Sequence, residues 1–347
     1  MLTKKQVTEI REHLEKAQNP LFFFDNDQDG LCSFLLLRRY IGRGRGVAAR
    51  SFPGLNKEYF KKVHELQADY IFILDKPVVD SDFFDEAAKV NIPIVWIDHH
   101  AIDKTNIPDF VFYYNPIFNK KKSSEPVTAL CWQLTGKEED AWIAVVGCIS
   151  DRFIPKFYSK VEKKFPELMP RGRRIFDIFY KSQIGRIAQI FGAGLKDKTT
   201  NVVNMLRFLI KAKSPYDVLE ESSANKEMHH RFKQIDSKYQ KFFIKALTQA
   251  KKSDKFIFFQ YGGDLSISAE IANELNYVFP EKIIVVAYIK EGKTNISMRG
   301  KNVRQILLEA IKDLEDATGG GHEFAVGARI KTEDIEKFKK NLEKIIK

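Results

Sequence analysis

Three apolar segments of this chain each run directly into an aspartate, and this recurrence constrains the fold more than any other feature. The segments cover residues 21–24, 70–74 and 92–97. Continuous apolar runs of this length are typical of strands buried on both faces, which occur in parallel sheets covered by helices. Because ligands of such sheets bind at the carboxyl ends of the strands, we expect a site that contains the acids that follow. These acids are Asp25, Asp75 and Asp98.

Helical spacing of apolar residues separates these strands and predicts helices over 31–39, 57–67 and 82–90. Strands that alternate with helices form right-handed βαβ units. The sequence therefore predicts an α/β fold with a doubly wound parallel sheet. The glycine- and arginine-rich stretch 42–46 predicts a flexible turn, and residues 1–18 predict an amphipathic charged helix.

The first acid opens a loop of three alternating carboxylates, Asp25, Asp27 and Asp29, followed by a glycine. Carboxylates this close repel one another unless a cation lies among them, which favours a divalent metal site. An EF-hand calcium loop begins in the same way, but its last ligand position would be Leu36, where a glutamate is required. A second interpretation, that the acids cap a helix beginning near Leu31, stays open.

With 347 residues the chain is long enough for two domains with separate cores. No apolar run reaches the length of a membrane span, so we expect a soluble cytoplasmic protein with no membrane partner. The 3 cysteines are far apart and include no C-x-x-C pair, which argues against a disulfide framework and a zinc knuckle.

Positive charge is concentrated in one part of the chain. The formal net charge is +11, and residues 152–253, here called the basic segment, carry 23 Lys and Arg against 9 Asp and Glu. The rest of the chain is slightly acidic. This asymmetry favours a polyanionic partner whose phosphates bind the basic segment while metal ions offset the acids. The alternative is an ordinary lysine-rich surface.

A mostly helical region is expected from 160 to 252, because apolar residues recur there at helical spacing. Breaks in this region are expected at Gly172, Gly192, Gly194 and Pro215. His229 and His230 fall on a charged helix and are expected to be surface residues. Before this region, the apolar segment 141–150 predicts a helix or a strand and ends in Asp151, a further candidate ligand.

The remaining residues predict a smaller α/β domain joined to the first by the helical connection. Its strands are expected over 255–261, 283–289, 294–299 and 324–330. Its helices are expected through Ile271, over 303–314 and from Glu333. We therefore divide the chain into domains at 1–155 and 254–347, with a basic helical connection at 156–253.

Asp98-His99-His100 is the sequence that gives the DHH phosphoesterase superfamily its name, and the chain resembles its archaeal-type RecJ-related members. The acidic loop at 25–30, Asp75 and the segment 147–151 resemble the other acidic motifs of the superfamily, in the same order. The segments that resemble the signatures of the DHH-associated domain are Ser297-Met298-Arg299 and Thr318-Gly319-Gly320-Gly321-His322. Together these motifs cover nearly the whole chain and are highly specific.

The resemblance implies two divalent ions, with Mn²⁺ expected and Mg²⁺ or Co²⁺ as substitutes, because mixed carboxylate and imidazole ligands suit such ions. The implied metal ligands are Asp25, Asp27, Asp29, Asp75, His99 and Asp151. Asp75 would bridge the ions, and His100 would be the catalytic acid or electrophile. Asp98 would fix the tautomer of a ligand imidazole. One departure is Phe23, where many relatives have a histidine; Asp25 either replaces that ligand or lies beside it.

The resemblance also implies a substrate-binding role for the last domain. Glycines allow backbone N–H groups to approach a phosphate closely, so the glycine turn should bind substrate together with two basic side chains. The implied substrate-binding residues are Arg299, Gly319, Gly320, Gly321 and His322. The alternative is a glycine cap of the helix 303–314. A loop beside the site is expected to include Asn115, Ser123 and Thr128.

These residues predict a metal-dependent phosphodiesterase that shortens single-stranded DNA or RNA from an end. Within the enzyme class, a nanoRNase or a cyclic-dinucleotide hydrolase is the alternative, since it shares every motif. A non-catalytic RecJ-like scaffold that binds replication or repair proteins is a further alternative. The retained aspartates and histidines argue against the scaffold.

Overall fold

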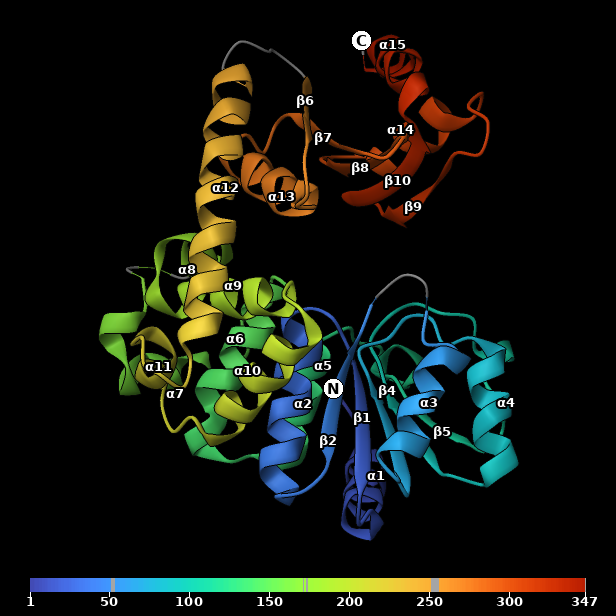
Figure 1. Ribbon diagram of the computed structural model, residues 1–347, viewed down its shortest axis with the longest axis vertical. Helices are drawn as coiled ribbons and strands as arrows, with labels where there is room; N and C mark the ends of the chain where they lie inside the picture. The colour runs from blue at the N-terminus through green and yellow to red at the C-terminus, as the bar shows by residue number, and fades with distance from the viewer. Residues whose placement is uncertain (51–53, 171, 173, 251–255, 347) are drawn as a thin grey trace. The chain divides into compact units, whose positions relative to one another are not determined.

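The computed structural model describes residues 1–50, 54–170, 172, 174–250 and 256–346 (Figure 1). Contacts between residues divide it into two compact units, Met1–Phe232 and Lys233–Lys347. The predicted boundary between 253 and 254 lies outside the described residues, as do two arginines of the basic segment, Arg171 and Arg173.

The first unit contains a parallel sheet of five strands. The strands are β1 (Pro20–Asp25), β2 (Arg45–Ala49), β3 (Tyr70–Leu74), β4 (Ile94–Ile97) and β5 (Val111–Tyr114). Their spatial order is β2-β1-β3-β4-β5, and every neighbouring pair is parallel. The chain therefore continues outward in opposite directions on the two sides of the β1–β3 pair. This pair is the topological switch point, where ligands of such sheets bind.

Helices cover both faces of this sheet, as the sequence predicts (Figure 1). The helices of this part are α1 (Lys4–Lys16), α2 (Gln28–Ile41), α3 (Lys57–Glu65), α4 (Ser81–Val90), α5 (Val127–Thr135) and α6 (Ala141–Ser150). On β1, Phe23 packs against Phe83 of α4, whereas Phe22 and Phe24 on the other face contact Phe34 of α2. Burial on both faces explains why the strand is uniformly apolar.

The turn predicted over 42–46 is shorter than expected, since residues 42–44 connect α2 to β2 and Arg45 and Gly46 already belong to the strand. Gly42 ends α2 with a φ of 75°, a conformation that glycine adopts without a steric penalty. β2 then begins at Arg45 and forms the edge of the sheet. A Cβ atom at Gly46 would lie 2.6 Å from the Phe34 ring, so this glycine lets β2 pass close to α2. The short strand has no long apolar run, so the sequence pattern did not predict it.

The helical region that follows packs largely on the first unit. Its helices are α7 (Tyr158–Lys164), α8 (Ile175–Lys181), α9 (Gln183–Leu195), α10 (Thr199–Lys211), α11 (Pro215–Leu219) and α12 (Lys226–Ala250). Short 3₁₀ helices occur at Lys104–Asn106, Pro116–Phe118, Glu138–Asp140, Pro166–Leu168 and Thr332–Asp334. Because α9 packs against α6 and α2, the contacts group residues 156–232 with the first unit, whereas we expected one connection from 156 to 253.

Two details of this region differ from the predictions. Gly192 and Gly194 do not break the chain but lie inside α9. A Cβ atom at Gly192 would lie 2.4 Å from Nε2 of Gln28, so the side chain of Gln28 packs closely against this glycine. His229 is buried, and its Nε2 atom lies 2.9 Å from the carbonyl oxygen of Val218, so it is not a surface residue.

The second unit is a mixed sheet covered by helices. Its elements are β6 (Phe256–Gly262), α13 (Ser268–Val278), β7 (Ile283–Lys290), β8 (Lys293–Arg299), α14 (Val303–Ile311), β9 (Thr318–His322), β10 (Ala325–Lys331) and α15 (Ile335–Ile345). The order is β6-β7-β8-β10-β9, in which only the β6–β7 pair is parallel. The predicted glycine turn is thus the edge strand β9, and it does not cap α14. Among the helices that the structure describes, none has the length and apolar character to cross a bilayer.

Candidate metal centre

The acids predicted from the strand ends lie together at the carboxyl ends of neighbouring strands. Asp25 is the last residue of β1, Asp75 follows β3, and Asp98 follows β4. Since β3 lies between β1 and β4, the three residues occupy neighbouring positions at the switch point. Asp29 comes from the first turn of α2, and Asp151 directly follows α6.

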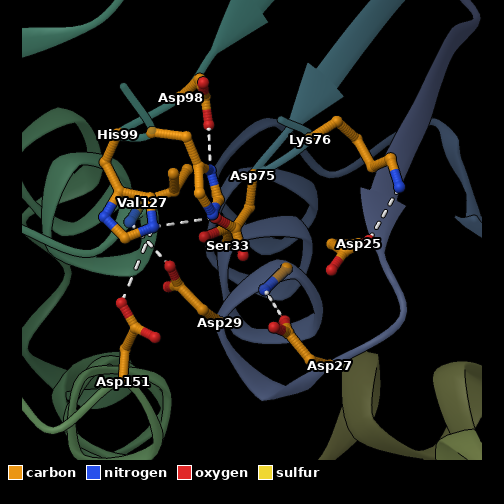
Figure 2. A network of polar contacts seen from close by, with 12 residues as sticks. Asp25, Asp27, Asp29, Ser33, Asp75, Lys76, Asp98, His99, Val127 and Asp151 are labelled. Carbon is orange, nitrogen blue, oxygen red and sulfur yellow. Dashed lines mark hydrogen bonds and ion pairs between the residues drawn. The ribbon is translucent and has the colours of Figure 1, made fainter. Parts of the chain in front are cut away.

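Two groups of side chains in the described part of the chain could hold a metal ion. One consists of Asp75, His99 and His100, and the other of Asp29, His99 and Asp151, with the potential ligand atoms of each group within 4.8 Å of one another. His99 belongs to both, because its Nε2 atom lies 3.3 Å from Oδ1 of Asp75 and 3.7 Å from Oδ2 of Asp151 (Figure 2). The two groups therefore form one continuous centre.

Asp75 is the residue that most clearly fits a cation. Its backbone φ is 60°, an unusual value for a residue other than glycine. Among the described residues, no group donates a hydrogen bond to its buried Oδ1 atom. Burial, followed by the negative charges of Asp29 and Asp27, raises the pKa of Asp75 well above its usual range. A divalent ion would supply the missing partner and relieve the repulsion, so the residues present fit such an ion.

Asp29 is fixed by the N-terminus of α5. Its two carboxylate oxygens accept hydrogen bonds from the backbone N–H groups of Val127, at 2.9 Å, and Thr128, at 2.7 Å. Burial and then the charge of Asp151 nevertheless raise the pKa of Asp29 to about 6. The sequence placed Thr128 in a loop beside the site; the structure places it in a helix that orients one of the acids.

Asp98 and His100 form a second part of the centre. The Nδ1 atom of His100 lies 2.7 Å from Oδ1 of Asp98, and Tyr113 donates to the other carboxylate oxygen at 3.1 Å. Asn115 donates to the carbonyl of His100 and to the Tyr113 hydroxyl, each at 2.8 Å. Burial lowers the pKa of His100, but the hydrogen bond and charge of Asp98 outweigh it, so this pKa is raised. The imidazole that Asp98 orients is thus that of His100 and not that of His99.

Asp25 and Asp27 lie outside both candidate ligand groups. Asp27 is the N-cap of α2 and accepts a hydrogen bond from the Gly30 N–H at 2.9 Å, so the capping interpretation holds for this acid. Burial and then the charge of Asp25 raise the pKa of Asp27 well above its usual range. Asp25 forms an ion pair with Lys76 at 2.8 Å. Lys76 was not among the predicted site residues, although a lysine directly after a buried strand and a candidate ligand is itself a signal.

Phe23 belongs to the core and not to the site. Its side chain is fully buried and contacts Tyr59 and Phe83. It therefore packs on the face of the sheet that α3 and α4 cover.

The candidate substrate residues lie together at one end of the second unit's sheet. β10 pairs with β8 on one side and β9 on the other, and Ala325 is the partner of both Arg299 and His322. The guanidinium of Arg299 donates to Oδ1 of Asn273 at 2.6 Å and to the carbonyl oxygens of Met298 and Val326.

The three glycines of β9 have different roles. Gly319 packs tightly, since a Cβ atom there would lie 3.1 Å from side chains of α14 and β10. Gly321 has a φ of 134°, which other residues rarely adopt. A Cβ atom at Gly320 would meet nothing within 4 Å, so no packing contact requires a glycine at this position.

Comparison with known proteins supports the fold. The DHHA1 domain family matches residues 245–347. A RecJ from Thermus thermophilus in complex with Mn²⁺ aligns with a TM-score of 0.70 and 18% identity over 99% of this chain, which spans only 54% of that protein. An exonuclease RecJ bound to manganese aligns with a TM-score of 0.68 and 17% identity over 100% of this chain and 95% of its own.

A pGpG-specific phosphodiesterase from Vibrio cholerae aligns more weakly, with a TM-score of 0.50 and 14% identity over 95% of this chain and 99% of that one. No curated protein matches the sequence. The chain therefore shares the fold of these RecJ proteins. Its C-terminal part is a DHHA1 domain.

Proposed function

We propose that this protein is a metal-dependent phosphodiesterase that removes nucleotides from an end of single-stranded DNA or RNA. The observation that carries the proposal is the pair of ligand groups that share His99 beside the buried carboxylate of Asp75. The RecJ-like fold over the whole chain supports it.

A divalent ion would be held by His99, which both ligand groups share, together with Asp75 of one group and Asp29 and Asp151 of the other. When bound there, it would supply Lewis-acid stabilisation of a phosphodiester and activation of water. We propose Mn²⁺ as the resident ion, with Mg²⁺ or Co²⁺ as substitutes, because the ligands mix carboxylates with an imidazole.

His100 would act on the substrate while Asp98 positions it. With Nδ1 engaged by Asp98 at 2.7 Å, the Nε2 atom remains for an oxygen of the phosphodiester. The raised pKa of His100 favours its protonated form, which suits donation of a proton or a charged hydrogen bond to that oxygen. Asp98, which also accepts a hydrogen bond from the Tyr113 hydroxyl, holds the ring in place.

The test of this function is an assay with end-labelled single-stranded DNA and RNA, from dinucleotides to long oligonucleotides, with Mn²⁺, Mg²⁺ or chelator. We expect progressive shortening of long strands with Mn²⁺ and none with chelator. Turnover of dinucleotides alone would favour the nanoRNase or cyclic-dinucleotide alternative, which the similarity to a pGpG-specific phosphodiesterase supports. Binding of nucleic acid or protein partners without any hydrolysis would favour the scaffold.

Replacing Arg299 with alanine should raise the KM for an oligonucleotide about ten- to a hundredfold, since it removes a charged hydrogen-bond donor from the proposed phosphate site. Mn²⁺ affinity, measured by titration calorimetry, should stay unchanged, because Arg299 and the metal centre belong to different units. Arg304→Ala is the matched control, as it removes an exposed arginine from the same unit. Equal effects of the two variants, or lost Mn²⁺ affinity in Arg299→Ala, would contradict this role.

A further inference from the structure

Lys76 places a fixed positive charge inside the acidic cluster. Its side chain is fully buried, and its Nζ atom lies 2.8 Å from Oδ1 of Asp25. The same ammonium donates to the carbonyl oxygen of Arg50 at 2.6 Å. The backbone is also fixed there, since the indole of Trp96 donates to the carbonyl oxygen of Lys76 at 3.0 Å. The lysine is therefore an integral part of the site and not a solvated surface cation.

One acid of the centre pairs with this internal cation, whereas others belong to the candidate ligand groups. Lys76 directly follows Asp75 in the sequence, yet its side chain extends toward Asp25 at the end of β1. In Figure 2, Asp25 and Lys76 lie on one side of Asp75, and His99 and Asp151 lie on the other. Both candidate ligand groups contain His99, and neither contains Asp25.

Asp27, the other acid on the side of Lys76, is also committed to an internal partner. It caps α2 through the Gly30 N–H. The Gly30 backbone lies so close to Asp25 that a Cβ atom there would be 2.4 Å from the Asp25 carbonyl oxygen. The acidic loop is thus held against the first turn of α2, and its first acid is paired with Lys76.

We propose that the ammonium of Lys76 takes the place of one of two metal ions, so that the chain binds a single tightly held divalent ion. This inference rests on the metal centre of the proposed function. An ammonium is a compact point charge with three donors, so it can neutralise Asp25 in a buried site. The same charge repels a divalent ion that approaches Asp25 and Asp27. The ion is consequently confined to the side of Asp29, His99 and Asp151.

The decisive measurement is the number of Mn²⁺ ions bound per chain, by equilibrium dialysis and metal analysis at a Mn²⁺ concentration that saturates the tight site. The wild-type protein should bind one ion, with the electron paramagnetic resonance spectrum of an isolated Mn²⁺. Two ions with the spectrum of an exchange-coupled pair would overturn the proposal. This count decides the matter even if a variant of Lys76 does not fold.

The variant Lys76→Met tests whether the charge of Lys76 is what excludes a second ion. Methionine has a similar length but no charge, so Asp25 becomes available to a metal ion, and the count should rise from one to two. A count that remains at one in the folded variant would mean that the ammonium does not exclude the second ion. The double variant Asp25→Asn/Lys76→Met leaves no buried unpaired charge, and it should return to one ion because it lacks the carboxylate.

The two proposals fail in different ways. A protein that binds one Mn²⁺ but hydrolyses none of the oligonucleotides would contradict the proposed function and leave the role of Lys76 intact. A protein that hydrolyses them but binds two Mn²⁺ ions would contradict only the role of Lys76.

Discussion

Replacing Asp75 with asparagine should reduce Mn²⁺-dependent hydrolysis by about a hundredfold or more, because changes to groups that merely support metal ligands already cost about 10- to 100-fold. The variant should also raise the melting temperature of the metal-free protein. Asp75 is buried among other acids, and burial together with their charges raises its pKa well above the usual range. Asparagine keeps the shape, removes the charge and tolerates the φ of 60°.

The gain in stability has a definite pH dependence. A carboxyl whose pKa is higher in the folded protein than in the unfolded chain opposes folding once the unfolded chain loses its proton. The stabilising effect of Asp75→Asn should therefore be larger at about pH 8 than at about pH 5. Activity assays and thermal melts with chelator check the two parts. Asp109→Asn, at an exposed position in the same unit, is the control and should change neither.

Either of two results would contradict this account of Asp75. More than a few percent of the Mn²⁺-dependent activity in Asp75→Asn would show that the carboxylate is not a metal ligand. A lower melting temperature in the metal-free variant would show that the ionised carboxylate stabilises the fold through a contact other than a metal ion.

The affinity for a long oligonucleotide should fall steeply with salt if the basic segment binds its backbone. Each phosphate contact with a single strand contributes about −0.7 to the slope of the logarithm of affinity against the logarithm of salt concentration. Turnover of a dinucleotide, which is too short to follow the basic segment, should depend much less on salt. Neutralising Arg171, Arg173 and Arg174 together should flatten the slope for the long strand by about 2 units if all three contact phosphates.

A matched variant separates this effect from net charge. Lys4, Lys5 and Lys16 are exposed on α1, so replacing them with glutamine removes the same charge outside the basic segment. Its long-strand slope should stay close to that of the wild type. Removing exposed charges of this kind costs little stability. Equal slopes for long and short substrates would identify the basic segment as ordinary surface and favour the short-substrate alternative.

Much of the fold could be predicted because its signals are local. The apolar runs before Asp25, Asp75 and Asp98 indicated buried parallel strands, and the structure has them as neighbours in one sheet. Strands β2 and β5 went unnoticed. β2 contains the sequence Arg-Gly-Val-Ala-Ala and lies at an edge, so its pairing with β1 and not its own composition makes it a strand.

The glycines show the limits of local patterns most clearly. Gly192 looked like a helix break, but it lies inside α9, where the side-chain amide of Gln28, far away in the sequence, packs against it. The glycines at 319–321 looked like a turn, but they form β9, because residues 318–322 pair with β10. A glycine has the same local preferences in each case, and its neighbours in space decide which conformation it adopts.

The sequence by itself determined the α/β class, the order of the motifs and the edge of the sheet at which the acids gather, since alternation of strands and helices dictates these. The assignment of individual metal ligands stays a prediction. Only the tertiary structure decided which partner each acid has. Asp29 accepts hydrogen bonds at the N-terminus of α5, Asp27 caps its own helix, and Asp25 forms an ion pair with Lys76. Three similar carboxylates in one short loop have similar local preferences, and the partner that each one finds depends on which distant backbone or side chain the fold brings within reach.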